Sequence, residues 1–223
     1  MTVLLRQVDD SSRGDHHHLD EGDQVYFLRE YTSRKGWQHG ETNSLISNLK
    51  KTMDLAGTPQ WPYKARAIAQ CAAELRRNVN PLRDLSWIPT PPSKAPSDPL
   101  YDDRLVQILR QAFPQGDVRE LVVQRASTTA VHVTSASRPP PAQLSAGYQV
   151  DGQLGHPKPA VIVFGDIVTT GSHFKAMSSP CFKPSPTSRS VAWSSRGESS
   201  PTTNKMEAAQ RWLHAVANPA ASP

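Results

Sequence analysis

The residues that could do chemistry follow a short apolar run. Residues 161–164 are four consecutive apolar residues, typical of a strand that is buried on both faces of a parallel sheet. Asp166 comes two residues later, and a Thr169-Thr170-Gly171 turn then opens a short helical stretch from Ser172. Such a turn offers hydroxyls, backbone N–H groups and the positive end of a helix dipole to a phosphate, while a carboxylate accepts hydrogen bonds from sugar hydroxyls. The pattern suits a phosphorylated-sugar site and suits equally a core strand that happens to end in these residues.

Helical and strand patterns alternate around this run. Apolar residues recur at helical spacing in three segments, 42–53, 62–79 and 104–109. Short apolar strands are expected at 85–88 and 121–123, and residues 25–28 either add an edge strand or pack on the core. Because helices alternate with strands, the sequence predicts an α/β fold with a mainly parallel central sheet.

Single side chains within the helices carry narrower expectations. Thr42 is expected to cap the first helix, and Pro62 suits the first turn of the second. Cys71 lies inside the second helix, where a small buried thiol without chemistry is expected. Asp103 and Arg104 are expected to form an ion pair on the face of the third helix.

Charged and polar residues follow each predicted strand. Ser93 and Lys94 come after the first strand, Arg125 after the second, and residues 166–172 after the third. In a parallel sheet ligands bind at the carboxyl ends of the strands, so these groups are expected to converge there. Basic groups and a phosphate turn around one carboxylate suit a sugar that carries phosphates at both ends. The alternative is that Lys94 and Arg125 are ordinary loop charges.

Residues 161–171 resemble the phosphoribosyl pyrophosphate (PRPP) signature of type I phosphoribosyltransferases, which is four apolar residues, two acids, two apolar residues and Thr-Thr-Gly. Gly165 stands where the first acid is expected. The preceding sequence is similar to the ComF-like (competence protein) branch in three places, the helix at 45–50 that ends in Lys, the Pro-rich run at 87–94, and Arg125 followed by the run at 143–150. The resemblance covers residues 41–177. The amino-terminal zinc-binding cysteines of that branch are missing, because the chain has two cysteines, Cys71 and Cys181.

The resemblance implies a Rossmann-like three-layer phosphoribosyltransferase fold and a transfer of phosphoribose from PRPP to a nitrogenous acceptor, with Mg²⁺ held largely by the ligand's own oxygens. Thr169, Thr170, Gly171 and Ser172 would then hold the 5-phosphate, and Asp166 would contact the ribose hydroxyls. The Ser93-Lys94 loop and Arg125 would face the leaving pyrophosphate, and the proline-rich residues 137–143 stand in place of the family's mobile cover.

Gly165 keeps two alternatives open beside the enzyme. Losing one carboxylate, with hydrogen bonds worth roughly 1.5–3 kcal/mol each, would cost on the order of ten- to a thousandfold in affinity or rate. One alternative is a non-catalytic relative that binds PRPP or a nucleotide in regulation or competence. The other is an inactive truncated homologue, because the residues after Met177 do not resemble the rest of such a domain.

Composition divides the 223 residues into four parts. Residues 1–23 are expected to be a disordered arm, whose His16-His17-His18 run is a weak metal site, and residues 24–177 the phosphoribosyltransferase-like domain. Residues 178–203, rich in Ser and Pro, are either a linker or a frame-shifted segment in which 191–193 is the one candidate strand. Residues 204–223 are expected to be a short amphipathic helix and tail.

The partners implied are PRPP and an unidentified base. Two cysteines suit a reducing cytoplasm, and no apolar run of membrane-spanning length or amino-terminal signal pattern is visible, so a cytoplasmic protein without a membrane partner is expected. A homodimer is a further expectation. The net charge of +5 leaves nucleic acid open as a partner without favouring it.

Overall fold

The chain folds around a six-stranded sheet. The computed structural model describes residues 3–9, 14–80, 84–128, 139–178 and 189–195, the last range by its backbone alone. The strands of the sheet are β1 (Arg6–Gln7), β2 (Val25–Glu30), β3 (Leu85–Pro89), β4 (Asp117–Val118), β7 (Ala160–Val168) and β8 (Arg189–Ser195). Their spatial order is β1-β2-β8-β7-β3-β4, and every neighbouring pair is parallel except β1 with β2. The predicted α/β fold with a mainly parallel sheet is confirmed.

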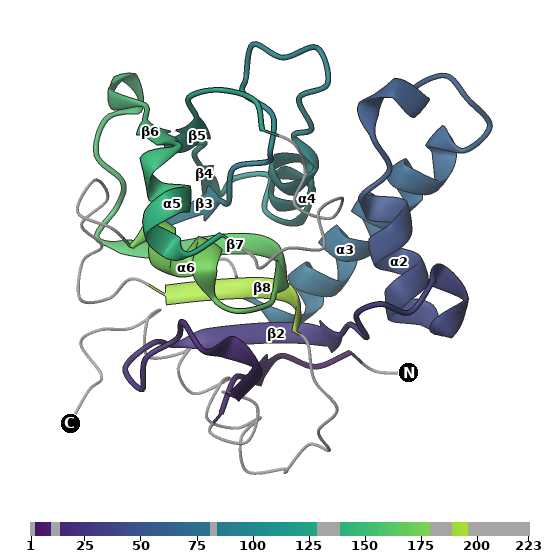
Figure 1. Cartoon of the computed structure of the whole chain (residues 1–223), viewed down its shortest axis with the longest axis horizontal. Helices are drawn as coiled ribbons and strands as arrows, with labels where there is room; N and C mark the ends of the chain where they lie inside the picture. The colour runs from purple at the N-terminus through teal and green to yellow at the C-terminus, as the bar shows by residue number, and fades with distance from the viewer. Residues whose placement is uncertain (1–2, 10–13, 81–83, 129–138, 179–188, 196–223) are drawn as a thin grey trace.

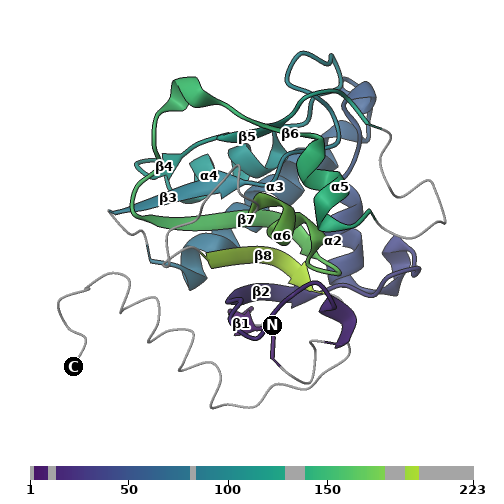
Figure 2. The same ribbon diagram turned by 60° about the vertical axis from the view of Figure 1, so that its left-hand side comes forward.

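Helices cover both faces of the sheet (Figure 1, Figure 2). One face is covered by α2 (Glu41–Leu49), α3 (Trp61–Asn78) and α4 (Arg104–Ala112). The other is covered by α6 (Ser172–Met177) and by a small antiparallel sheet of β5 (Val122–Gln124) and β6 (Tyr148–Val150), with α5 (Pro141–Ala146) packed beside α6. Short 3-10 turns complete the described chain as η1 (Gly14–His16), η2 (Trp37–His39), η3 (Met53–Leu55) and η4 (Gly152–Leu154). None of the helices in the described ranges is long and apolar enough to cross a membrane.

The two central strands are buried on both faces, as their apolar runs predicted. On β7, Ile162 and Phe164 point into the core beneath α2, α3 and α4, whereas Val161 and Val163 join the core beneath α6 and the β5–β6 sheet. On β3, Trp87 belongs to the first core and stacks on Phe113 with ring centroids 4.9 Å apart. This alternation follows from the two-residue period of a strand.

The helices at 42–53, 62–79 and 104–109 are all present, with shifted ends. α2 begins at Glu41 and Gly40 takes the cap position, so the expectation that Thr42 caps this helix is wrong. Pro62 lies in the first turn of α3, as predicted, because its fixed φ suits that turn and its missing N–H costs nothing there. Cys71 is fully buried in α3, and burial raises the pKa of its thiol.

The predicted strand at 121–123 exists but does not join the main sheet. It forms β5, which pairs antiparallel with β6 in register Val122↔Val150. The place beside β3 belongs to β4, whose Asp117 lies opposite Ser86. The run is apolar because Leu121 and Val122 pack into the core beneath α6 and the β5–β6 sheet, and not because the strand lies in the main sheet.

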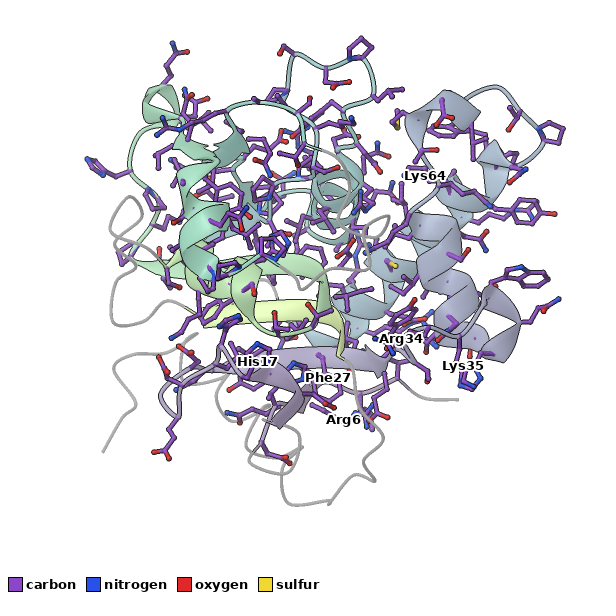
Figure 3. All side chains as sticks on the ribbon, viewed as in Figure 1. Arg6, His17, Phe27, Arg34, Lys35 and Lys64 are labelled. Carbon is purple, nitrogen blue, oxygen red and sulfur yellow. The ribbon has the colours of Figure 1, made fainter. Side chains whose placement is uncertain are left out.

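The amino-terminal segment also differs from the disordered arm expected for residues 1–23. In its described parts, 3–9 and 14–23, Leu5, Val8 and Leu19 are buried, and β1 pairs with β2, so β2 is not an edge strand. Arg6 lies over the Phe27 ring, 4.8 Å from its centroid (Figure 3). Three apolar side chains scattered among polar ones attach this segment to the sheet, and they form no periodic pattern that a sequence reading could use.

Part of the predicted linker is a central strand. Residues 189–195 form β8, which pairs in parallel with β2 on one side and β7 on the other, in place of the linker expected over 178–203. The strand expected at 191–193 is thus present and longer than predicted. The remainder of that segment beyond Ser178, and the helix and tail expected at 204–223, lie outside the described residues.

Candidate functional site

The Thr169-Thr170-Gly171-Ser172 turn lies at the carboxyl end of β7, beside the middle of the sheet, as the sequence predicted. Gly171 has φ 85° and ψ 0°, a left-handed conformation in which a side chain is disfavoured, and it precedes the first residue of α6. The hydroxyls of Thr170 and Ser172 are both buried and hydrogen-bond each other at 2.7 Å. Gly171 therefore gives the turn a left-handed residue directly before α6, and the two hydroxyls of the turn are engaged with each other.

Residues 14–23, here called the amino-terminal cover, pack directly on this turn. His16 donates a hydrogen bond from Nδ1 to the Thr169 carbonyl, and the backbone N–H of His18 donates to the Thr170 carbonyl at 2.9 Å. The Leu19 side chain fills the space beside Gly171. A Cβ atom at residue 171 would lie 2.6 Å from Leu19 Cδ2. The cover thus occupies one side of the turn, a contact that the sequence did not predict.

Ion pairs fasten the same cover to α6. Lys175 Nζ lies 2.6 Å from a carboxylate oxygen of Asp20 and 2.7 Å from one of Asp23. Asp20 is largely exposed, so its pair with Lys175 is screened by water and contributes little to stability. Leu19 is buried and lies against Gly171, so the cover is also attached by an apolar contact.

Asp166 lies on β7 between two cations. Its Oδ2 atom is 2.7 Å from Arg104 Nη2 and 3.3 Å from Lys50 Nζ. Lys50 directly follows α2, and Arg104 is the first residue of α4. Burial raises the pKa of Asp166, but the charges of Lys50 and Arg104 outweigh it and hold that pKa well below its usual range. The carboxylate is therefore ionised throughout the physiological range.

The expected ion pair between Asp103 and Arg104 is absent from the described contacts. Arg104 Nη1 instead pairs with Asp102 Oδ2 at 2.8 Å, and the Asp103 carboxylate accepts a hydrogen bond from Gln107. Adjacent residues on a helix point in different directions, so Arg104 is free to face the carboxyl end of β7.

The network continues from Asp102 to a buried lysine. Lys64, on α3, is 2% exposed, and its Nζ atom lies 2.8 Å from Asp102 Oδ2 (Figure 3). It also donates hydrogen bonds to the carbonyls of Leu49 and Lys51 at 2.9 and 2.7 Å. Burial lowers the pKa of Lys64, and the Asp102 carboxylate opposes this shift. We call Lys64, Asp102, Arg104, Asp166 and Lys50 the alternating ion network, since three cations alternate with two carboxylates.

Gly165 stands next to Asp166, where the PRPP signature has an acid. A Cβ atom there would lie 3.5 Å from Thr90 Oγ1 and 3.6 Å from Thr90 Cγ2, which are ordinary contact distances. Thr90 directly follows β3, and its N–H donates to the Phe164 carbonyl at 2.8 Å. The space beside residue 165 accepts a Cβ atom, so crowding does not require glycine at this position.

The loop with Ser93 and Lys94 contacts the segment that follows Arg125. The Thr128 N–H donates to the Ser93 carbonyl at 2.7 Å, and Ser127 Oγ accepts from the Ala95 N–H at 3.1 Å. These hydrogen bonds connect the Ser93-Lys94 loop with the segment after Arg125, two of the three groups that were predicted to converge. The two segments meet although β5 is outside the main sheet.

Arg125 itself is exposed, and its Nε donates to the Tyr148 carbonyl at 2.8 Å. Tyr148 belongs to β6, and its hydroxyl hydrogen-bonds His173 Nδ1 at 2.8 Å. His173 is the second residue of α6, so Tyr148 connects Arg125 to the helix that follows the turn. Across the ranges that the structure describes, no hydrogen bond or ion pair joins Lys94 or Arg125 to Asp166.

Sequence reasoning missed the partners of Asp166. Lys50 was noted only as the end of a helix, and Lys64 and Asp102 were not singled out. Lys64 and Asp102 are 38 residues apart, so no local spacing could have joined them. A lysine on an otherwise apolar helix face was the one available signal.

A metal site is not evident from the described side chains alone. Within those ranges, no three His, Cys, Asp or Glu side chains gather where they could hold a metal ion. His16, from the predicted histidine run, is buried against the Thr169 carbonyl. Comparison with protein-family models gives no match to this chain, and comparison with curated proteins gives none either.

Proposed function

We propose that this chain is a phosphoribosyltransferase-like protein with a Rossmann-like three-layer fold, which binds PRPP with Mg²⁺ and transfers phosphoribose to a nitrogenous acceptor in the cytoplasm. The observation that carries the proposal is the position of the Thr169-Thr170-Gly171-Ser172 turn at the carboxyl end of a central parallel strand, with a left-handed glycine. Ligands of open α/β sheets bind at that edge. A position of this turn away from the carboxyl end of a parallel strand would contradict the proposal.

The roles follow from the chemistry of each group. Residues 169–172 would bind the 5-phosphate through backbone N–H groups and hydroxyls, and Asp166 would accept hydrogen bonds from the ribose. Lys94, Arg125 and the Ser93 loop would face the pyrophosphate. Mg²⁺ would be carried mainly by the pyrophosphate oxygens, as suits an ion that keeps few protein ligands.

The reaction needs no protein nucleophile. A lone pair on the acceptor nitrogen attacks the anomeric carbon, the bond from that carbon to the pyrophosphate oxygen breaks, and pyrophosphate leaves with the electron pair. The Asp166 carboxylate, ionised and close to the sugar, would stabilise the positive charge that develops on the ring. Lys94 and Arg125 would stabilise the negative charge on the leaving group.

The amino-terminal cover imposes a condition on this proposal. The Thr170 and Ser172 hydroxyls are buried and residues 14–23 pack on the same turn, so the structure around the turn must shift before a phosphate can reach both hydroxyls. The ion pairs of Lys175 with the cover are partly exposed and give way easily.

The alternatives are a non-catalytic relative that binds PRPP or a nucleotide, and an inactive truncated homologue. Gly165 favours the non-catalytic relative, because the position that carries an acid in the signature has no side chain. The two cations on Asp166 also favour it, since they neutralise the remaining carboxylate.

Titration calorimetry with PRPP and Mg²⁺ tests the proposal on four chains: wild type, Asp166→Ala, Gly165→Asp and the control Asp117→Ala. Asp117 is also in an ion pair, with Arg119, but lies opposite Ser86 near the amino end of β3. We expect micromolar binding by wild type that is lost in Asp166→Ala and kept in Asp117→Ala. A folded wild type that does not bind PRPP refutes the proposed enzyme and leaves the nucleotide-binding relative and the inactive homologue.

Turnover separates the two candidates. Pyrophosphate release is measured with a panel of nucleobases on wild type and Gly165→Asp. We expect the added carboxylate to raise turnover by roughly ten- to a thousandfold. Binding without pyrophosphate release in either chain would instead assign the non-catalytic function.

A further inference from the structure

The alternating ion network holds Asp166 by one oxygen only. Both Arg104 Nη2 and Lys50 Nζ approach Oδ2, at 2.7 and 3.3 Å. Within the described residues, no hydrogen bond to the other oxygen, Oδ1, is present. The Asp166 side chain is 16% exposed, so a ligand can still reach it. One oxygen is therefore fixed by the protein and the other is available to accept a hydrogen bond.

Arg104 binds two carboxylates at once, unlike an arginine in a simple surface ion pair. Its guanidinium spans two carboxylates, with Nη1 on Asp102 and Nη2 on Asp166, at 2.8 and 2.7 Å. A planar guanidinium keeps these two directions in a fixed relation, which the single ammonium of lysine does not. Arg104 thus transmits the position of Asp102 to Asp166.

The far end of the network is rigid. Asp102 also pairs with Lys64, which is fully enclosed and is tied to the carbonyls of Leu49 and Lys51. A buried lysine with three oxygen partners has little freedom to move. The orientation of Asp166 is therefore set by a chain of contacts that begins in the core between α2 and α3.

We propose that Arg104 is a positioning residue that holds Asp166 by Oδ2 so that Oδ1 faces a ligand hydroxyl, which makes the site selective for a ribose phosphate over its 2-deoxy counterpart. This inference rests on the proposed function, because it assumes that a sugar phosphate binds at the end of β7. Its content beyond that function is the role of Arg104, which touches no ligand. The ionised state of Asp166 agrees with it, since an ionised carboxylate is a strong acceptor.

A network that serves stability alone would behave differently. Weakening it would lower the unfolding free energy and would lower the affinity for all sugar phosphates alike. A positioning role predicts a change in the ratio between two ligands that differ by one hydroxyl, and this ratio is insensitive to a uniform loss of folded protein.

The test measures affinities for ribose 5-phosphate and 2-deoxyribose 5-phosphate by calorimetry on the full chain. We expect wild type to prefer ribose 5-phosphate by about ten- to a hundredfold, the value of one charge-assisted hydrogen bond. Arg104→Lys should bring this ratio close to one, with little change for the deoxy sugar. Arg119→Lys, which alters another Arg–Asp pair at the sheet's edge, should keep the wild-type ratio.

A double-variant cycle shows whether Arg104 acts through Asp166. In an Asp166→Asn background, Arg104→Lys should no longer alter the ratio. Urea melts of each variant confirm that the folded state is being compared. An unchanged ratio in Arg104→Lys overturns this inference and leaves the proposed function standing. The inference also fails if folded wild type binds PRPP but binds ribose 5-phosphate and 2-deoxyribose 5-phosphate equally well. If folded wild type binds no sugar phosphate at all, the proposed function fails as well.

Discussion

Replacing Gly171 with alanine tests the packing of the amino-terminal cover on the turn. Two costs are expected. Gly171 has φ 85°, and a non-glycine residue in this left-handed region costs about 1–2 kcal/mol. The new Cβ would also lie 2.6 Å from Leu19 Cδ2, and overpacking of this kind costs about 1–3 kcal/mol. Gly171→Ala should therefore lower the unfolding free energy by about 2–5 kcal/mol.

The two costs can be separated by matched variants in urea unfolding. Gly57 has φ 81° and no heavy atom within 4 Å of its would-be Cβ, so Gly57→Ala should carry the backbone cost alone. Leu19→Ala alone should cost about 2–5 kcal/mol by loss of buried surface. In the double variant the clash disappears, so Gly171→Ala and Leu19→Ala should couple favourably by about 1–3 kcal/mol. Two results together would show that the cover does not pack on the turn. Gly57→Ala and Gly171→Ala would lower the unfolding free energy equally, and the effects of Gly171→Ala and Leu19→Ala would be additive.

Three further outcomes are expected. Lys64→Met should lower the unfolding free energy in chemical denaturation by about 3–5 kcal/mol, because it leaves a buried carboxylate with one cation fewer. Lys175→Met at the cover should lower it by only about 0–1 kcal/mol. Equal decreases in the two variants would refute this expectation. The pKa of Asp166 is lowered in the folded state, so its contribution to stability is present above about pH 4 and is lost as the pH falls further. Between about pH 6 and pH 3 the unfolding free energy of Asp166→Asn should therefore fall less steeply than that of wild type. Parallel curves for the two chains would contradict this expectation. Cys71 is buried with a raised pKa, so in a Cys181→Ser background mass spectrometry should find no alkylation until urea unfolds the chain, and rapid labelling of the native protein would be inconsistent with this packing.

The sequence predicted the elements whose burial leaves a periodic pattern. Val161 to Phe164 and the helix of Cys71 were correctly assigned because a strand buried on both faces and an amphipathic helix each impose a repeat on neighbouring residues. The strand around Val122 was found for the same reason, but its partner was not. An apolar run records that a strand is buried and carries no information on which strand lies beside it.

The candidate site was predictable only where its residues are close in sequence. The turn from Thr169 to Ser172 is contiguous, and its place at the end of β7 follows from the strand before it. The partners of Asp166 come from the ends of two other helices, and the cover comes from residues 14–23, about 150 positions earlier in the chain. Single charges and scattered apolar residues carry no period, so the local pairing of Asp103 with Arg104 was the natural and wrong expectation.

The place of β8 has a consequence for how the chain is made. It is the last of the described strands in sequence, yet it lies between β2 and β7. Before residues 189–195 leave the ribosome, the pair β1–β2 and the trio β7–β3–β4 share no backbone hydrogen bond across that gap, and each presents an unpaired strand edge. Such unpaired edges associate with one another in nascent chains, and β8 removes both of them when it pairs with β2 and β7.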